Sequence, residues 1–155
     1  MPAGPNVTGE SNARAVRRWF TEGWTGRLDL ADEIFSPILR TNGILVGTDG
    51  PKRNNRMRLE GFPDLRVIID DLIVADDRCI VRLTWTGTHT GPFGGVPPTG
   101  KTVQVHGIAI WRFAEGRVTE IWSMQDQFAL FQQIGAIPPE IAGPPAPSPS
   151  DSRAT

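Results

Sequence analysis

The stretch from Gly107 to Gly135, GIAIWRFAEGRVTEIWSMQDQFALFQQIG, constrains the fold of this chain most strongly. It predicts two strands joined by a tight turn at Ala114-Glu115-Gly116, followed by a short helix. Asp126 stands where the second strand runs into that helix. Apolar residues flank this carboxylate on both sides, at Trp122, Met124, Phe128 and Leu130. We therefore expect Asp126 at the edge of an apolar space, with the rest of the chain building a pocket over it.

Helical patterns fill the first part of the chain, and strand patterns fill the second. Helices are predicted over residues 10–24, 28–35 and 51–60, with a short strand over 38–46 that the turn pair Asn42-Gly43 interrupts. Strands are predicted over 65–74, 79–89, 101–113 and 117–126. Helices that precede a meander of long antiparallel strands indicate an α+β fold, with the helices packed on one face of a curved sheet.

Length and composition indicate one domain of ordinary type. The chain has 155 residues, and we place the domain at 10–137, with a loose segment at 1–9 and a disordered Pro/Ser-rich tail at 138–155. Cys79 is the single cysteine, so no intrachain disulfide can form. Neither an apolar leader nor a membrane-spanning run is present in the sequence, and we expect a cytoplasmic protein.

Charge and residue types exclude several classes of function. The 16 basic and 17 acidic residues leave a net charge of −1, which offers no electrostatic case for binding nucleic acid or an anionic membrane. The third predicted helix is basic, and we expect its charges on a solvated face. Two histidines and one cysteine do not favour a metal site. No glycine-rich cofactor motif is present, so ordinary side chains or a bound small molecule must supply the chemistry.

The turn at Ala114-Glu115-Gly116 sets which residues share a face with Asp126. A three-residue loop with Gly116 in the left-handed region pairs Phe113 with Arg117, His106 with Met124 and Gln104 with Asp126. This register puts Gln104, His106, Ile108, Ile110 and Arg112 on one face with Trp122, Met124 and Asp126. A two-residue loop would shift the register by one and move His106 to the other face.

In that register a carboxylate and an imidazole line one apolar concavity. Desolvation raises the pKa of a carboxyl group, and a raised pKa suits general acid/base catalysis near neutral pH. Asp126 is equally explained as the N-cap of the helix that begins at Gln127. His106 could instead be an ordinary strand histidine. His89, before a loop rich in glycine and proline, could line the rim of the pocket or anchor that loop.

Several short motifs, in order, resemble the SnoaL-like polyketide cyclases of the nuclear-transport-factor-2-like superfamily. The motifs are FPDL (62–65), GTHTG (87–91), PPTGK (97–101), GIAIWRF (107–113), EGRVTEIW (115–122), the aspartate four residues on, and QQIG (132–135). The resemblance covers about residues 10–137. It implies a cone-shaped α+β domain, in which a curved mixed sheet wraps around the helices and encloses a deep apolar pocket.

The resemblance also implies a cofactor-free enzyme that closes a ring in a polyketide-type intermediate by an aldol reaction. In that family an aspartate at the position of Asp126 is the general acid/base. We add His106 as a second catalytic residue. Further pocket residues are expected at Gln104, Arg112, Trp122, Met124, Trp85 and His89, of which Gln104 and Arg112, with His106, could donate hydrogen bonds to the substrate.

Two other functions fit the same residues. The pocket could fold a reactive substrate that cyclises, isomerises or is hydroxylated without proton transfer by the protein, or the chain could be a non-catalytic binding module. By resemblance we also expect a homodimer. The face opposite the pocket, with Val105, Trp111 and Phe113, would then be the exposed apolar surface that a second copy covers.

Overall fold

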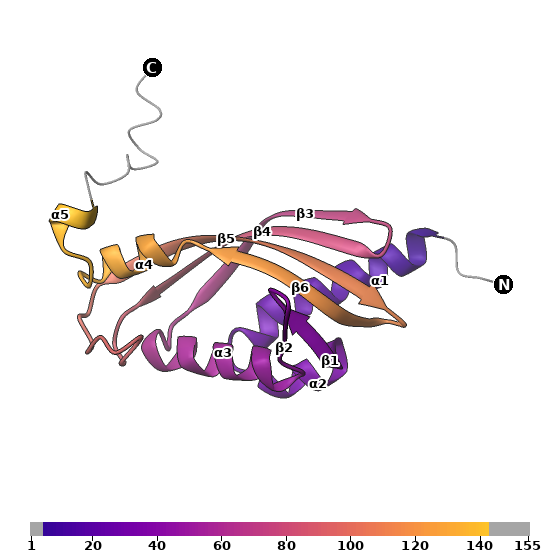
Figure 1. The fold of residues 1–155 in the computed structure, drawn as a ribbon, viewed down its shortest axis with the longest axis horizontal. Coiled ribbons are helices and arrows are strands. Elements are labelled where there is room, and N and C mark those ends of the chain that lie inside the picture. The colour runs from indigo at the N-terminus through magenta and orange to yellow at the C-terminus, as the bar shows by residue number, and fades with distance from the viewer. Residues whose placement is uncertain (1–4, 143–155) are drawn as a thin grey trace, which may run out of the picture.

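A six-stranded sheet curls over the helices of the first half in the computed structural model, which describes residues 5–142 (Figure 1). The strands are β1 (Phe35–Thr41), β2 (Ile44–Leu45), β3 (Arg66–Ala75), β4 (Arg78–Thr88), β5 (Thr102–Ala114) and β6 (Arg117–Gln125), in the order β2-β1-β6-β5-β4-β3. β1 pairs parallel with β6, and the other neighbours are antiparallel. The predicted α+β fold with a curved, mixed sheet is confirmed.

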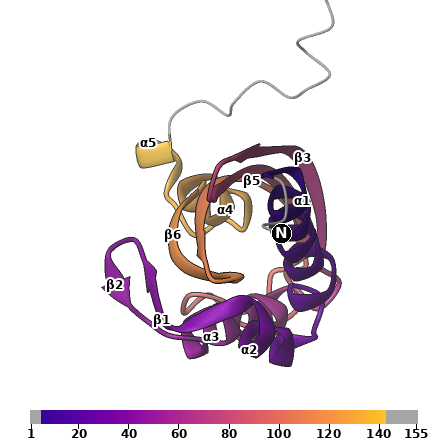
Figure 2. The ribbon, with the colours of Figure 1, turned by 90° about the vertical axis from the view of Figure 1, so that its right-hand side faces the viewer.

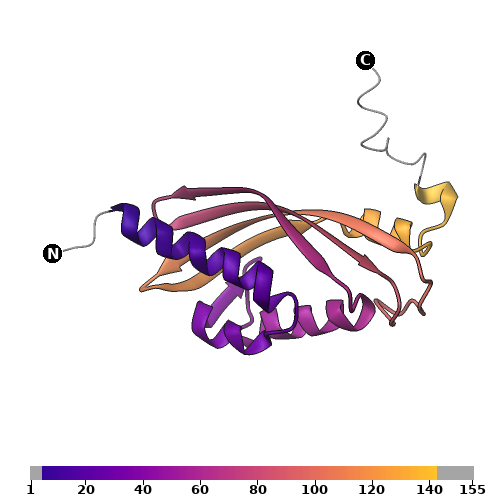
Figure 3. The same cartoon turned by 180° about the vertical axis from the view of Figure 1, so that it is seen from behind.

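The helices of the first half cover the concave face of the sheet, as the views in Figures 2 and 3 agree. The α-helices are α1 (Pro5–Arg18), α2 (Ala31–Ile34), α3 (Asp49–Gly61), α4 (Gln127–Gln133) and α5 (Pro139–Ala142). A π-helical turn, η1 (Trp19–Gly23), continues α1, and a 3₁₀ turn, η2 (Leu28–Leu30), precedes α2. Helix α1 begins at Pro5 rather than at the predicted Glu10, and α5 opens the predicted tail, of which residues 143–155 lie outside the described residues.

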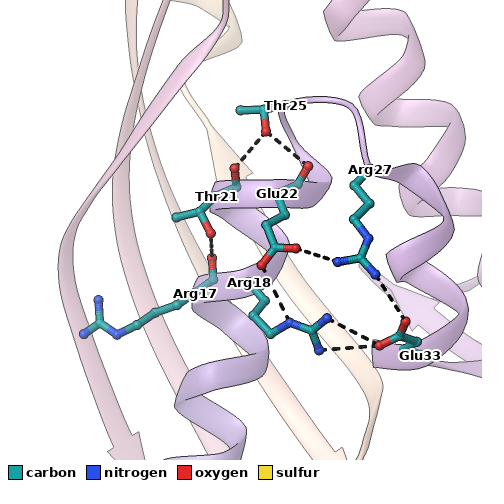
Figure 4. A network of polar contacts seen from close by, with 7 residues as sticks. All are labelled: Arg17, Arg18, Thr21, Glu22, Thr25, Arg27 and Glu33. Carbon is teal, nitrogen blue, oxygen red and sulfur yellow. Dashed lines mark hydrogen bonds and ion pairs between the residues drawn. The ribbon is translucent and has the colours of Figure 1, made fainter.

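Exposed ion pairs connect the end of the first helical segment to α2 (Figure 4). Arg18 pairs with Glu22 at 3.8 Å and with Glu33 at 3.4 Å, and Arg27 pairs with the same two carboxylates at 2.8 and 3.8 Å. Each exposed pair is worth no more than about 1 kcal/mol. The network therefore contributes little to the stability of the fold.

The residues of β5 alternate between the core and the outer face along the whole strand. The core side holds Val103, Val105, Ala109, Trp111 and Phe113. Trp111 packs on Phe20 and Phe35, with ring centroids 5.6 and 5.3 Å apart. The prediction that Val105, Trp111 and Phe113 lie on an exposed face is therefore wrong, because the helices of the first half cover that face.

The hairpin between β5 and β6 has a different register from the predicted one. Its turn has two residues, Glu115 (φ 52°) and Gly116 (φ 78°), which is the geometry of a tight type I′ turn. Ala114 pairs with Arg117, and a bulge beyond Phe113 shifts the pairing by one more residue. Further along, the pairs are Ile108 with Met124 and Gly107 with Gln125. The predicted pairs Phe113–Arg117, His106–Met124 and Gln104–Asp126 are wrong.

The turn and the bulge each shift the pairing by one residue, which makes a total shift of two residues. Because side chains alternate between the two faces with a period of two, the predicted residues still share one face. His106, Ile108, Ile110 and Arg112 still share a face with Trp122 and Met124. That face is the outer, convex side of the sheet, where Ile108, Ile110, Trp122 and Met124 are exposed. The prediction that this face lines the pocket is wrong, because alternation assigns residues to two faces without saying which one the helices cover.

Candidate functional site

A cavity of about 90 Å³ lies between the concave face of the sheet and the helices. Its apolar wall consists of Trp19, Phe20, Trp24, Phe35, Pro51, Leu83, Ile108, Ala109, Trp111 and Ile121. Its polar lining consists of Thr41, Asn54, Asn55, Arg58, Ser123 and Gln125. We call this space the inner cavity. It is smaller than the roughly 300 Å³ of a typical ligand pocket.

The inner cavity borders a wider, more open groove. Thr41, Asn54, Arg58, Ser123 and Gln125 line both spaces. The groove adds Met57, Phe93, Gly94 and Phe131 from α3, the loop before β5, and α4. A ligand larger than one ring would therefore extend from the inner cavity into the groove.

The π-helical turn η1 brings three aromatic rings to the inner cavity. The Trp24 amide donates to the Trp19 carbonyl at 2.9 Å, so the turn contains one residue more than an α-helical turn. Trp19, Phe20 and Trp24 all line the inner cavity as a result. Gly23 is needed there, because a Cβ at this position would lie 2.3 Å from the Trp19 ring.

Arg58 on α3 lines the inner cavity, which corrects the prediction that all the charges of this helix are solvated. Its guanidinium lies 3.9 Å from the Trp24 ring centroid and 5.9 Å from that of Trp85. Desolvation by burial lowers the pKa of Arg58 to about 10, so the side chain is still charged at neutral pH. Arg53 and Arg56 on the same helix are exposed, as predicted.

Two amide side chains beside Arg58 are held by protein donors. Arg58 Nη1 donates to Asn55 Oδ1 at 2.9 Å, and Trp85 Nε1 donates to Gln125 Oε1 at 3.1 Å. Trp85 was predicted to line the pocket. It is fully buried behind Gln125 and does not line the inner cavity, so its contribution is to orient the Gln125 amide.

Asp126 lies on the other side of the sheet from the inner cavity. Its Oδ1 accepts a hydrogen bond from the Ala129 amide at 2.9 Å, which confirms the N-cap interpretation. The side chain is exposed, and it lines an outer groove with Arg82, His106, Ile108 and Met124. The outer groove and the inner cavity have Gly107, Ile108 and Gln125 in common.

His106 belongs to a polar chain on the outer face. Its Nδ1 lies 2.9 Å from Thr84 Oγ1, and that hydroxyl donates to Asp70 Oδ2 at 2.7 Å. Because the Thr84 hydrogen is used on Asp70, His106 Nδ1 must be the donor to Thr84. The structure thus brings His106 and Asp126 to one groove, but not to the inner cavity.

The other residues predicted for the pocket are dispersed. Gln104 is exposed, and its backbone exchanges two hydrogen bonds with the Gln133 side chain, at 2.7 and 2.9 Å. Arg112 pairs with Glu120 at 3.8 Å on the outer face. Trp122 is exposed, whereas Met124, which is 80% exposed, lines both the outer groove and the groove next to the inner cavity.

His89 is fully buried, and its Nδ1 lies 2.9 Å from Thr99 Oγ1. It therefore anchors the glycine- and proline-rich loop, which was one of its two predicted roles. It does not line the inner cavity.

Sequence reasoning missed Asn55 and Arg58, although a signal for them exists. Pro51, Asn55 and Arg58 follow the i, i+4, i+7 spacing of one helix face, and all three line the inner cavity. Across residues 5–142 no three His, Cys, Asp or Glu side chains gather as a metal site would require. No helix in that range is long and apolar enough to span a membrane.

Comparison with models of known families identifies one family. The family model of the SnoaL-like polyketide cyclases matches residues 14–134. A proposed SnoaL-like polyketide cyclase from Jannaschia sp. CCS1 is similar in structure, with 32% identity and a TM-score of 0.76 over 89% of this chain and 99% of that one. TsrD from Streptomyces laurentii shows 25% identity and a TM-score of 0.72 over 84% of this chain and 97% of its own.

A third protein of similar structure is proposed to have a different activity. AclR from Streptomyces galilaeus, a proposed hydroxylase, shows 27% identity and a TM-score of 0.69 over 87% of this chain and all of that one. None of the curated proteins matches this chain in sequence. The fold therefore supports a cyclase-type role without selecting one reaction.

Proposed function

This chain belongs to the SnoaL-like polyketide cyclase family, and from that premise we propose that it closes a ring in a polyketide-type intermediate without a cofactor. The observation that carries the proposal is the inner cavity, where Trp19, Trp24 and Trp111 surround polar groups. Flat rings of this kind suit a flat, conjugated ligand. The adjoining groove would hold the rest of the molecule.

The proposed reaction is an intramolecular aldol closure. A base removes a proton from a carbon flanked by two carbonyls, and the electron pair moves onto a carbonyl oxygen to form an enolate. The enolate carbon then attacks a ketone of the same molecule, and an acid returns a proton to the new alkoxide. The enzyme's main contributions are to fold the substrate so that the two carbons meet and to polarise the carbonyls.

Asp126 is the proposed general acid/base, by the family resemblance. The groove that it lines shares Gly107, Ile108 and Gln125 with the inner cavity, and only one of its two oxygens is used by the helix cap. A base at this position requires the substrate to reach the outer groove.

The alternative is that the protein folds a reactive substrate and supplies no proton. One observation favours it: among the described residues, no carboxylate or imidazole side chain lines the inner cavity. Solvent water or another group of the substrate would then remove the proton from the carbon and return a proton to the new alkoxide.

Turnover of candidate polyketides by Asp126→Asn separates the two mechanisms. Asparagine keeps the shape and the cap but cannot accept the proton, so we expect a loss of about 10²–10⁴-fold in kcat if Asp126 is the acid/base. Asp76→Asn, at the exposed turn between β3 and β4, is the control. Full activity of folded Asp126→Asn selects the templating alternative, and a wild-type protein that accelerates no ring closure contradicts the proposed function.

The outer face supports a homodimer as part of the proposal. Ile110 and Trp122 form an exposed apolar surface on β5 and β6 beside the outer groove, and a second copy would remove it from water. We expect Ile110→Glu to yield a monomer in light scattering, whereas Ile44→Glu on the exposed strand β2 leaves the mass unchanged. A wild-type monomer at micromolar concentration contradicts this part of the proposal.

A further inference from the structure

The amide groups of the inner cavity have fixed orientations. Trp85 Nε1 and the Arg58 guanidinium are groups that can only donate hydrogen bonds. Each must therefore face an amide oxygen, Gln125 Oε1 for Trp85 and Asn55 Oδ1 for Arg58. The two NH₂ groups are turned away from these donors, so these two contacts do not use them.

Asn55 is the clearest of these groups. It is 2% exposed, it lines the inner cavity, and its Nδ2 has no hydrogen-bond partner in the described structure. A buried donor without a partner destabilises the fold, so native proteins rarely leave one unpaired. A ligand oxygen in the inner cavity would satisfy it.

Arg58 adds a positive charge that no carboxylate balances. Within residues 5–142 it forms no ion pair, whereas Lys52 on the same helix pairs with Asp32 at 2.7 Å. The Arg58 guanidinium is held against the Trp24 ring, 3.9 Å from its centroid. Partial burial removes hydration from this charge, and the cation–π contact with Trp24 offsets only part of that cost, which points to an anionic partner that is not part of the chain.

We infer that the inner cavity is a subsite for an anionic oxygen on a flat, conjugated ligand, either a carboxylate or an enolate. Arg58, Asn55 Nδ2 and Gln125 Nε2 are the donors, and the tryptophan rings hold the conjugated plane. The inference deepens the proposed function and rests on it for the class of ligand. In the proposed ring closure, this subsite would take up the negative charge that develops on the carbonyl oxygen as the carbon loses its proton.

Binding of small probes, followed by tryptophan fluorescence, tests the subsite. The probes are 2-naphthoate and its neutral isostere 2-naphthamide. A carboxylate subsite predicts that naphthoate binds at least tenfold more tightly, the size expected for hydrogen bonds to a charged group. An enolate subsite predicts that the protein increases the enolate absorbance of the 1,3-diketone 1-phenyl-1,3-butanedione at neutral pH.

Two variants assign the effect to Arg58. Arg58→Met is expected to abolish whichever preference the wild type shows, and Arg56→Met, at an exposed position on the same helix, is expected to keep it. Thermal unfolding checks that Arg58→Met is folded under the conditions of the binding assay. Its unfolding temperature should fall, because the variant loses the hydrogen bond to Asn55 Oδ1 and the contact with the Trp24 ring. A purely structural Arg58 would lower the unfolding temperature in the same way, but it would leave the affinities of the wild type for the two naphthalene probes alike.

The inference is overturned if the wild type neither prefers naphthoate nor stabilises the enolate, or if Arg58→Met retains the preference. Failure of the proposed function looks different. A protein that closes no ring but selects naphthoate through Arg58 would contradict the proposed function and leave the subsite standing. A protein that closes a ring, and whose affinity for the probes is unchanged by Arg58→Met, would support the proposed function and contradict the subsite.

Discussion

The contribution of the Asp126 helix cap to the free energy of unfolding can be measured separately from any role of Asp126 in catalysis. Helix α4 has seven residues, and both its Leu130 and its C-cap residue Ile134 are buried in the core. The Asp126 carboxylate satisfies the Ala129 amide at 2.9 Å. Replacing a capping aspartate with alanine typically costs about 1 kcal/mol, and the lost negative charge at the helix N-terminus costs about 0.3–1 kcal/mol more.

We therefore expect Asp126→Ala to lower the free energy of unfolding by about 1–2 kcal/mol. Asp126→Asn keeps the hydrogen bond and loses only the charge, so it should cost about 0.3–1 kcal/mol. For a domain of this size, each kcal/mol corresponds to roughly 2–4 °C in Tm. Leu130→Ala, which empties a fully buried site in the same helix, should cost more than either, about 2–5 kcal/mol.

Urea unfolding followed by circular dichroism measures all three variants under one set of conditions. The expected order of stability is wild type, Asp126→Asn, Asp126→Ala and Leu130→Ala. If alanine is as stable as asparagine, the carboxylate does not cap α4 and the reasoning fails. If asparagine is more stable than alanine, the asparagine side chain still caps α4. A loss of activity in Asp126→Asn then cannot be attributed to an unfolded helix.

Three further predictions follow from single contacts. A Cβ at Gly91 would lie 1.8 Å from the Glu60 carbonyl oxygen, so Gly91→Ala should lose at least about 1–3 kcal/mol in urea unfolding, and wild-type stability would disprove this close approach. Burial raises the pKa of the Cys79 thiol to about 11, so iodoacetamide at pH 8 should label the unfolded protein only, and labelling of the native protein would contradict that burial. The Thr88 backbone amide and hydroxyl, both at 2.7 Å, lower the pKa of Asp64. The stabilising contribution of the Asp64 carboxylate is therefore present above the unfolded pKa of about 3.9 and lost as the pH falls through the lower folded value. The difference in unfolding free energy between wild type and Asp64→Asn should therefore shrink from pH 7 to pH 3. A difference that stays constant over this range would contradict the lowered pKa.

The local sequence pattern was sufficient to predict the order of the helices and strands and the family. The Asn42-Gly43 turn joins β1 to β2 as expected, with both residues at positive φ, because the conformations open to these two residues are a property of the residues themselves. The strands begin and end within a few residues of their predicted positions, since alternation is a local signal. The cap at Asp126 was equally visible, because its partner lies three residues away.

Which face of the sheet lies inside was decided by tertiary structure. Both faces of β5 carry large apolar residues, Val105 and Trp111 on one and Ile108 and Ile110 on the other, so composition could not choose between them. The choice depends on Phe20 and Phe35, which pack on Trp111 from distant parts of the chain.

The same holds for Arg58. Its spacing from Asn55 is local and readable, but the ring that holds its guanidinium belongs to Trp24, which follows the π-helical turn. In sequence, a basic residue on a polar helix has the pattern of a solvated charge. Only packing against rings from other elements removes part of its hydration, and that partial desolvation makes a charged side chain into a candidate binding group.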